Sequence, residues 1–68
     1  MMNGLVVKRG EFYVARIRAK SRFYDEYGNL WSKESQAVRV FHDETMAVRE
    51  ARRVGGVVKR MTDGRVED

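Results

Sequence analysis

Hydrophobic and polar residues alternate along the first third of the chain in the manner of antiparallel strands. Residues 5–7 are apolar, residues 8–11 contain a glycine turn, and residues 12–18 alternate again. Alternation with a period of two places successive side chains on opposite faces of a sheet. Two such runs around a tight turn are typical of a hairpin. The pattern therefore predicts a hairpin over residues 5–18.

The second strand of this hairpin has two different faces. Its mostly apolar face comprises Tyr13, Ala15, Ile17 and Ala19. Its other face becomes basic along the strand and comprises Phe12, Val14, Arg16, Arg18 and Lys20.

The middle of the chain predicts a long turn and a third strand. The turn is expected over residues 23–29, because Gly28 and Asn29 accept a positive φ more readily than other residues. The third strand falls within residues 30–41. Its most secure part is residues 36–41, where β-branched and aromatic side chains dominate.

A change of period after residue 42 predicts a helix. Asp43 is a suitable N-cap, and apolar residues then recur at spacings of three and four as far as Val54. The two glycines at residues 55–56 supply a left-handed C-cap. A fourth strand is expected over residues 57–61, and the acidic tail at residues 62–68 is expected to fray.

Together these elements predict one α+β domain over residues 1–68. Its order is β-β-β-α-β, with a small antiparallel sheet and one helix packed on one face. We expect the other face to be free, flat and basic. This assignment depends on register, because a slip of one residue moves every side chain of a strand to the opposite face.

Composition argues against an enzyme. The chain has 68 residues, of which 43% are hydrophobic, so few apolar residues remain to line a deep substrate pocket. No serine has an evident base, and no glycine-rich loop precedes the helix. The single histidine, His42, has no cysteine to join it, so we expect no metal and no cofactor.

The same composition bears on location. The chain contains no cysteine, which is typical of a reducing compartment. Its first residues lack the features of a signal peptide, and no apolar run is long enough to span a bilayer. We therefore expect a soluble, cytoplasmic protein that is not bound to membranes.

Charge points to a polyanionic partner. The formal net charge is +4, and basic residues dominate residues 8–22. Clustered lysine and arginine bind phosphate backbones through counterion release. The predicted nucleic-acid contacts are Arg16, Arg18, Lys20, Arg22 and Arg39. The alternative is that these charges only solvate the outer face of a half-buried sheet.

Aromatic residues offer additional contacts. Phe12 and Trp31 are candidates to stack on a base or cover a sugar. Core packing competes with this role, and we expect Trp31 and at least one tyrosine to help close the core of so small a domain.

Part of the chain resembles a known family. The resemblance rests on residues 10–18 (GEFYVARIR), the turn with Asp25-Glu26 and Gly28, and residues 40–43 (VFHD) before an alanine-containing helix. This pattern resembles the AP2-like, arm-type DNA-binding domains of phage and transposon integrases. Such domains lay a three-stranded antiparallel sheet in the major groove and pack one helix behind it. The resemblance implies DNA contacts by Arg16, Arg18, Lys20 and Arg39, and packing roles for Phe41 and Ala47.

The predicted strands at residues 5–7 and 57–61 depart from that family. The chain also resembles small phage proteins of unknown function. Three interpretations follow. The first is a non-enzymatic module that binds nucleic acid, most simply duplex DNA. The second is a phage-type accessory protein that binds and modulates a host protein with an acidic surface. The third is a homodimer formed through the edge of the sheet.

Overall fold

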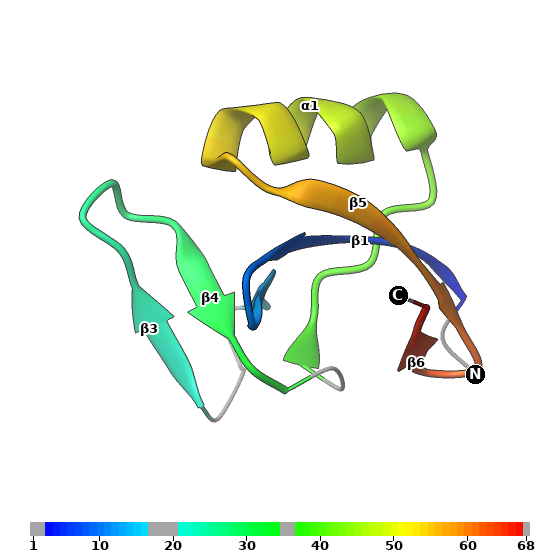
Figure 1. The fold of residues 1–68 in the computed structure, drawn as a ribbon, viewed down its shortest axis with the longest axis horizontal. Helices are drawn as coiled ribbons and strands as arrows, with labels where there is room; N and C mark the ends of the chain where they lie inside the picture. The colour runs from blue at the N-terminus through cyan, green and yellow to red at the C-terminus, as the bar shows by residue number, and fades with distance from the viewer. Residues whose placement is uncertain (1–2, 17–20, 35–36, 68) are drawn as a thin grey trace.

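The computed structural model describes residues 3–16, 21–34 and 37–67. Its strands are β1 (Gly4–Arg9), β2 (Phe12–Val14), β3 (Arg22–Tyr24), β4 (Leu30–Ser32), β5 (Val57–Thr62) and β6 (Arg65–Val66), and its helix is α1 (Glu44–Val54). Within these residues the strands form one antiparallel sheet in the order β3-β4-β2-β1-β5-β6, and α1 packs on one face (Figure 1). The predicted α+β class, with a single helix against an antiparallel sheet, is confirmed.

The predicted first hairpin is present. β1 and β2 pair with Lys8 opposite Tyr13 and Arg9 opposite Phe12, around a turn in which Gly10 has φ 61°. The ladder of β2 ends earlier than predicted, at Val14. Residues 17–20, which were expected to continue this strand, lie outside the described residues.

The region expected to be a long turn forms a second hairpin instead. β3 and β4 pair with Phe23 opposite Trp31, and the turn shrinks to residues 25–29. The carboxylate of Asp25 closes this turn, because its Oδ1 accepts the backbone N–H groups of Tyr27 and Asn29, both at 2.9 Å. An aspartate that bonds to the backbone beyond it favours a tight turn.

The strand predicted within residues 30–41 is present as β4, but residues 36–41, expected to be its most secure part, do not belong to it. Residue 36 lies outside the described residues, and residues 37–41 form no strand. They form two isolated bridges, Val38 with Ala15 and Phe41 with Leu5. The segment lies between the end of β2 and the start of β1, where those two strands diverge. Its alternating side chains therefore reach both faces of the sheet without a continuous ladder.

Local signals set both ends of α1 as predicted. Asp43 is the N-cap, and its Oδ1 accepts the N–H of Thr45 at 2.8 Å. Gly55 ends the helix with φ 73°, the left-handed conformation that glycine adopts at little cost. β5 then follows as predicted and pairs with β1 over five residues. Within the tail, the chain turns back as β6, where Val66 lies opposite Met61, and residue 68 lies outside the described residues.

Apolar side chains pack on both faces of the sheet. The helix-side core comprises Val7, Val14, Trp31, Phe41, Ala47, Ala51 and Val54. The core on the other side comprises Val6, Val38 and Met61. In Figure 1, α1 lies above β1 and β5, while β3, β4 and β6 lie below them, so the sheet bends away from the helix. The expectation of a flat, free face opposite the helix is therefore wrong, because the bend closes that face around a second core.

Candidate nucleic-acid interface

The predicted basic face is the face on which α1 packs. Val14 belongs to the helix-side core and Phe12 packs against it, and alternation places Arg16 on the same side. Arg39 also lies there, with its Nη1 3.9 Å from Oε2 of Glu50 on α1. Arg16 and Arg39 share a face as predicted, but not the one opposite the helix. The helix packs there because that face carries the larger apolar surface, including Trp31.

The other predicted cations do not join this pair. Arg22 is exposed on the edge strand β3, opposite Ser32, which in turn lies opposite Tyr13. Since Tyr13 packs against the core away from the helix, Arg22 projects from that other face. Arg18 and Lys20 lie outside the described residues. The predicted contact set is thus divided between the two sides of the sheet.

Trp31 cannot be a stacking contact, because its side chain is fully buried. Its Nε1 donates a 2.9 Å hydrogen bond to Oδ2 of Asp25, so the one polar atom of the indole is satisfied inside the fold. The competing expectation, that Trp31 helps close the core, is confirmed. Phe12 is half-buried and meets Phe23 edge to face, with ring centroids 4.9 Å apart.

A different basic surface surrounds the C-terminal half of α1. Within the described residues it gathers five arginines, which we call the arginine surface: Arg9, Arg39, Arg49, Arg52 and Arg53. Three of them come from the helix, one from the end of β1 and one from residues 37–41. Sequence analysis missed this surface as a unit, although the close spacing of the three helical arginines was a local signal for it.

Glu50 lies beneath the arginine surface. Only 12% of its side chain is exposed, and it binds Arg53 through two bonds, Nε to Oε1 at 2.6 Å and Nη2 to Oε2 at 2.8 Å. The hydrogen bonds from Arg53 hold the pKa of Glu50 below its usual value, despite partial burial, and the same pairing raises the pKa of Arg53. Glu50 therefore positions two guanidinium groups, those of Arg39 and Arg53, while presenting little negative charge to solvent.

Asp25 plays the corresponding role at the β3–β4 turn. Partial burial alone would raise the pKa of this carboxyl, but hydrogen bonds from Trp31, Asn29 and Tyr27 outweigh it and lower the pKa to about 2. Its Oδ2 also lies 3.8 Å from Nη2 of Arg9, and its side chain is 10% exposed. The turn is thus held against the core by a carboxylate that stays ionised at neutral pH.

Two further hydrogen bonds tie strand, turn and helix together. Arg9 donates from Nη1 to the carbonyl of Val54 at 3.0 Å, which satisfies one of the free carbonyls at the helix end. Arg53 donates from Nη1 to Oδ1 of Asn29 in the turn. The guanidinium of Arg9 also lies 4.4 Å from the centre of the Trp31 ring system.

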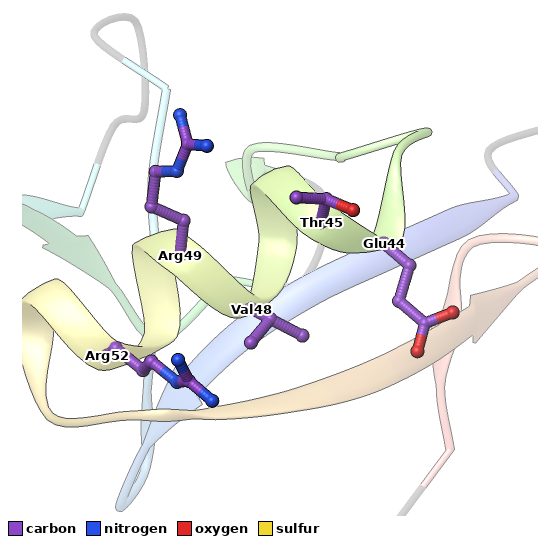
Figure 2. Close-up of a pocket in the computed structure, with 5 residues that line it drawn as sticks. All are labelled: Glu44, Thr45, Val48, Arg49 and Arg52. Carbon is purple, nitrogen blue, oxygen red and sulfur yellow. The ribbon is translucent and has the colours of Figure 1, made fainter.

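Two hollows flank the arginine surface. One, of about 470 Å³, is lined by Glu44, Thr45, Val48, Arg49 and Arg52. In Figure 2, Val48 and Arg52 extend from α1 toward β5, whereas the side chain of Arg49 extends away from β5. The second hollow, of about 560 Å³, lies between the β3–β4 turn and the end of α1 and is lined by Arg9, Tyr27, Asn29, Arg52, Arg53, Val54 and Gly55.

The helical arginines repel one another. Arg49 precedes Arg52 and Arg53 by about one turn, and like charges at this spacing destabilise a helix by about 0.2–0.5 kcal/mol per pair. In the part of the chain that the structure describes, Arg49 and Arg52 have no ion-pair or hydrogen-bond partner. The helix dipole favours Arg52 and Arg53 in the last turn, but it does not explain Arg49.

Comparisons with known proteins supply no relative. No family model matches the chain, and neither a curated protein nor a solved structure matches it. Among residues 3–16, 21–34 and 37–67, no cluster of three or more histidine or acidic side chains could hold a metal ion. No helix in those segments is long and apolar enough to cross a membrane. A functional assignment therefore rests on the chemistry of the surface.

Proposed function

We propose that this chain is a small nucleic-acid-binding protein that contacts phosphate groups through the arginine surface. The observation that carries the proposal is the arrangement of charge. Five guanidinium groups face solvent around the C-terminal half of α1, whereas the two carboxylates that pair with them, those of Asp25 and Glu50, are almost buried. An arginine can bind a phosphate with two parallel N–H groups, which a lysine cannot do.

Some guanidinium groups of the arginine surface are already hydrogen-bonded within the protein, and others are available to bind a ligand. Arg53 uses three of its five N–H groups on Glu50 and Asn29, so two remain to face a ligand. Such a side chain is already ordered, which reduces the entropy lost on binding. Arg49 and Arg52 are the available groups, and a bound polyanion would also relieve their mutual repulsion.

In this proposal the protein acts by binding alone, without catalysis, in the cytoplasm. Phosphate contacts position a protein on nucleic acid without reading bases, so we expect little sequence preference. The proposal keeps the class of partner that the sequence indicates, but moves the contact from a free sheet face to the helix side.

A host-protein partner is the second candidate. Strand β3 is an edge strand, and Phe23 and Tyr24 on it are 41% and 59% exposed. An exposed edge can accept a strand from another protein, and aromatic side chains give such contacts their affinity. This arrangement suits the phage-type accessory role, and it uses a surface distinct from the arginines.

A charge-matched pair of double variants tests the proposal. Arg49→Gln/Arg52→Gln removes two charges from the arginine surface, and Lys59→Gln/Arg65→Gln removes two charges from β5 and β6. Each phosphate contact contributes about 0.9 to the slope of log affinity against log salt on duplex DNA. We expect the first variant to lower that slope by about 2 and the second to leave it almost unchanged. The measurement is fluorescence anisotropy with a labelled duplex, from about 50 mM to about 200 mM salt.

Two outcomes would count against the proposal. Equal losses in both variants would mean that net charge alone attracts the polyanion. Absence of binding by the wild type at low salt, both to this duplex and to a single strand of the same length, would exclude nucleic acid and favour a protein partner. That partner would then be sought by retention on the immobilised protein at moderate salt.

A further inference from the structure

The hollow between the β3–β4 turn and the end of α1 combines an aromatic side chain with guanidinium groups. Tyr27 lines it and is 79% exposed, the largest exposure among the large hydrophobic residues that the structure describes. Arg9, Arg52 and Arg53 line it as well. Its volume of about 560 Å³ lies within the range of small-ligand sites, roughly 300–1,000 Å³.

The backbone that carries Tyr27 is held in place. The N–H of Tyr27 donates to Asp25 at 2.9 Å, and Gly28 donates to the Asp25 carbonyl at 3.1 Å. Asn29, two residues further on, is bound by both Asp25 and Arg53. The ring therefore projects from a braced turn, although nothing in the core requires an aromatic residue there.

We propose that this hollow receives one unpaired nucleotide of a single-stranded nucleic acid. The base stacks on Tyr27, and Arg52 and the remaining N–H groups of Arg53 bind the adjoining phosphate. Base stacking on an aromatic ring tolerates any sequence because every base has a π-face. A base inside a duplex is already stacked on both sides and cannot offer this face to Tyr27.

This inference rests on the proposed function and makes it more specific, because it predicts a preference for single strands over duplexes. Phosphate contacts are common to both forms of nucleic acid. Discrimination must then come from the base, and among the described residues Tyr27 is the exposed aromatic group beside the arginine surface.

The test compares three labelled probes of equal length: an oligothymidylate, an abasic strand with the same phosphates, and a duplex. The proteins are the wild type, Tyr27→Ala, Tyr27→Phe and the control Tyr24→Ala. Tyr24 is an exposed tyrosine on β3 that does not line the hollow. Because Tyr27 is so exposed, its substitution should leave the fold intact, which thermal melts would verify.

We expect the wild type to bind the oligothymidylate roughly tenfold more tightly than the abasic strand. Tyr27→Ala should abolish that difference and leave duplex binding unchanged. Tyr27→Phe and Tyr24→Ala should behave like the wild type.

The outcomes separate this inference from the proposed function. If binding depends on Arg49 and Arg52 but Tyr27→Ala affects all three probes alike, or none, the nucleotide site is refuted and the proposed function stands. An equal effect of Tyr24→Ala would also refute the site. If the wild type binds none of the probes at low salt, both proposals fall.

Discussion

Among the residues that the structure describes, the helix side of the sheet buries seven core residues around Trp31, whereas the other side buries three, Val6, Val38 and Met61. The first face is closed by packing α1 against it. The second is closed by the bend of the sheet itself, together with residues 37–41. A chain of this size can therefore make both faces of one sheet apolar, provided that the sheet curls around the smaller core.

The basic residues also differ between the two faces of the sheet. On the helix side, three of the five arginines of the arginine surface, Arg9, Arg39 and Arg53, contact the almost buried carboxylates of Asp25 and Glu50. On the other side, the strand positions that the structure describes carry Lys8, Arg22 and Lys59 and no acid. The arginines around the end of α1 form one continuous surface, whereas Lys8, Arg22 and Lys59 are spread over three strands. The position of the helix thus decides which basic residues form a site.

The strongest test of the unequal cores is the pair Trp31→Ala and Met61→Ala. Loss of Trp31 should lower the free energy of unfolding by about 3–5 kcal/mol, because it removes the centre of the larger core and one of the hydrogen-bond donors to Asp25. Loss of Met61 should cost about 2 kcal/mol. Urea unfolding followed by circular dichroism measures both, and equal costs would contradict the comparison.

A closer comparison uses two neighbours on β1. Val6 and Val7 are both fully buried, but they belong to opposite cores. Val7→Ala should cost about 2 kcal/mol, from two lost methyl groups and the remaining cavity. Val6→Ala should cost less, because the smaller core around it is completed by half-buried side chains that can relax. If Val6→Ala proved the more damaging change, the bent face would hold the principal core.

A smaller effect is expected at the start of α1. Asp43→Ala removes the N-cap bond to Thr45 and should cost about 1 kcal/mol. The matched control, Asn3→Ala, removes a similar 2.7 Å bond to the N–H of Asp63 in an exposed turn far from the helix-side core. The urea midpoint should fall more for Asp43→Ala than for Asn3→Ala. The reverse order would indicate that packing of the helix contributes little to the stability of the fold.

The last prediction concerns the dependence of stability on pH. For the wild type, the contribution of Asp25 should not change with pH near neutrality and should be lost only in acid. The pKa of Asp25 is about 2 in the folded protein against an ordinary value of 3.8. Its ionised form therefore stabilises the fold above about pH 4, and that contribution is lost as the pH falls towards 2. The urea midpoint of the wild type should fall across this window. Asp25→Asn should be less stable at neutral pH and lose less on acidification, whereas parallel curves would show that Asp25 is not the titrating group.

Elements with local signals could be predicted from the sequence. The first hairpin, the helix and β5 follow from residues that act on their immediate neighbours, such as Asp43 and Gly55. The β3–β4 hairpin was missed because its turn depends on side-chain bonds from Asp25, which alternation does not reveal. Residues 37–41 were predicted as a strand because their side chains alternate between the two faces of the sheet. A segment that forms only isolated bridges to two diverging strands shows the same alternation.

The candidate site was harder to predict, for a geometrical reason. Alternation correctly places Arg16 and Arg39 on one face, but it does not say which face a helix will cover. Arg9 and Arg39 lie far from the helical arginines in the sequence, and they lie beside them only in the folded chain. The sequence allowed Trp31 to be either a core residue or a stacking contact for nucleic acid, and its complete burial shows that it is a core residue.

Trp31 is the single tryptophan of the chain, and it lies directly beneath Arg9, which lines the hollow beside Tyr27. Indole emission responds to nearby charge and to the hydrogen bond at Nε1. A phosphate that draws Arg9 away from the ring would change both the intensity and the wavelength of that emission. If phosphate binds there as proposed, Trp31 is an intrinsic fluorescent reporter of binding, which would make label-free titration practical.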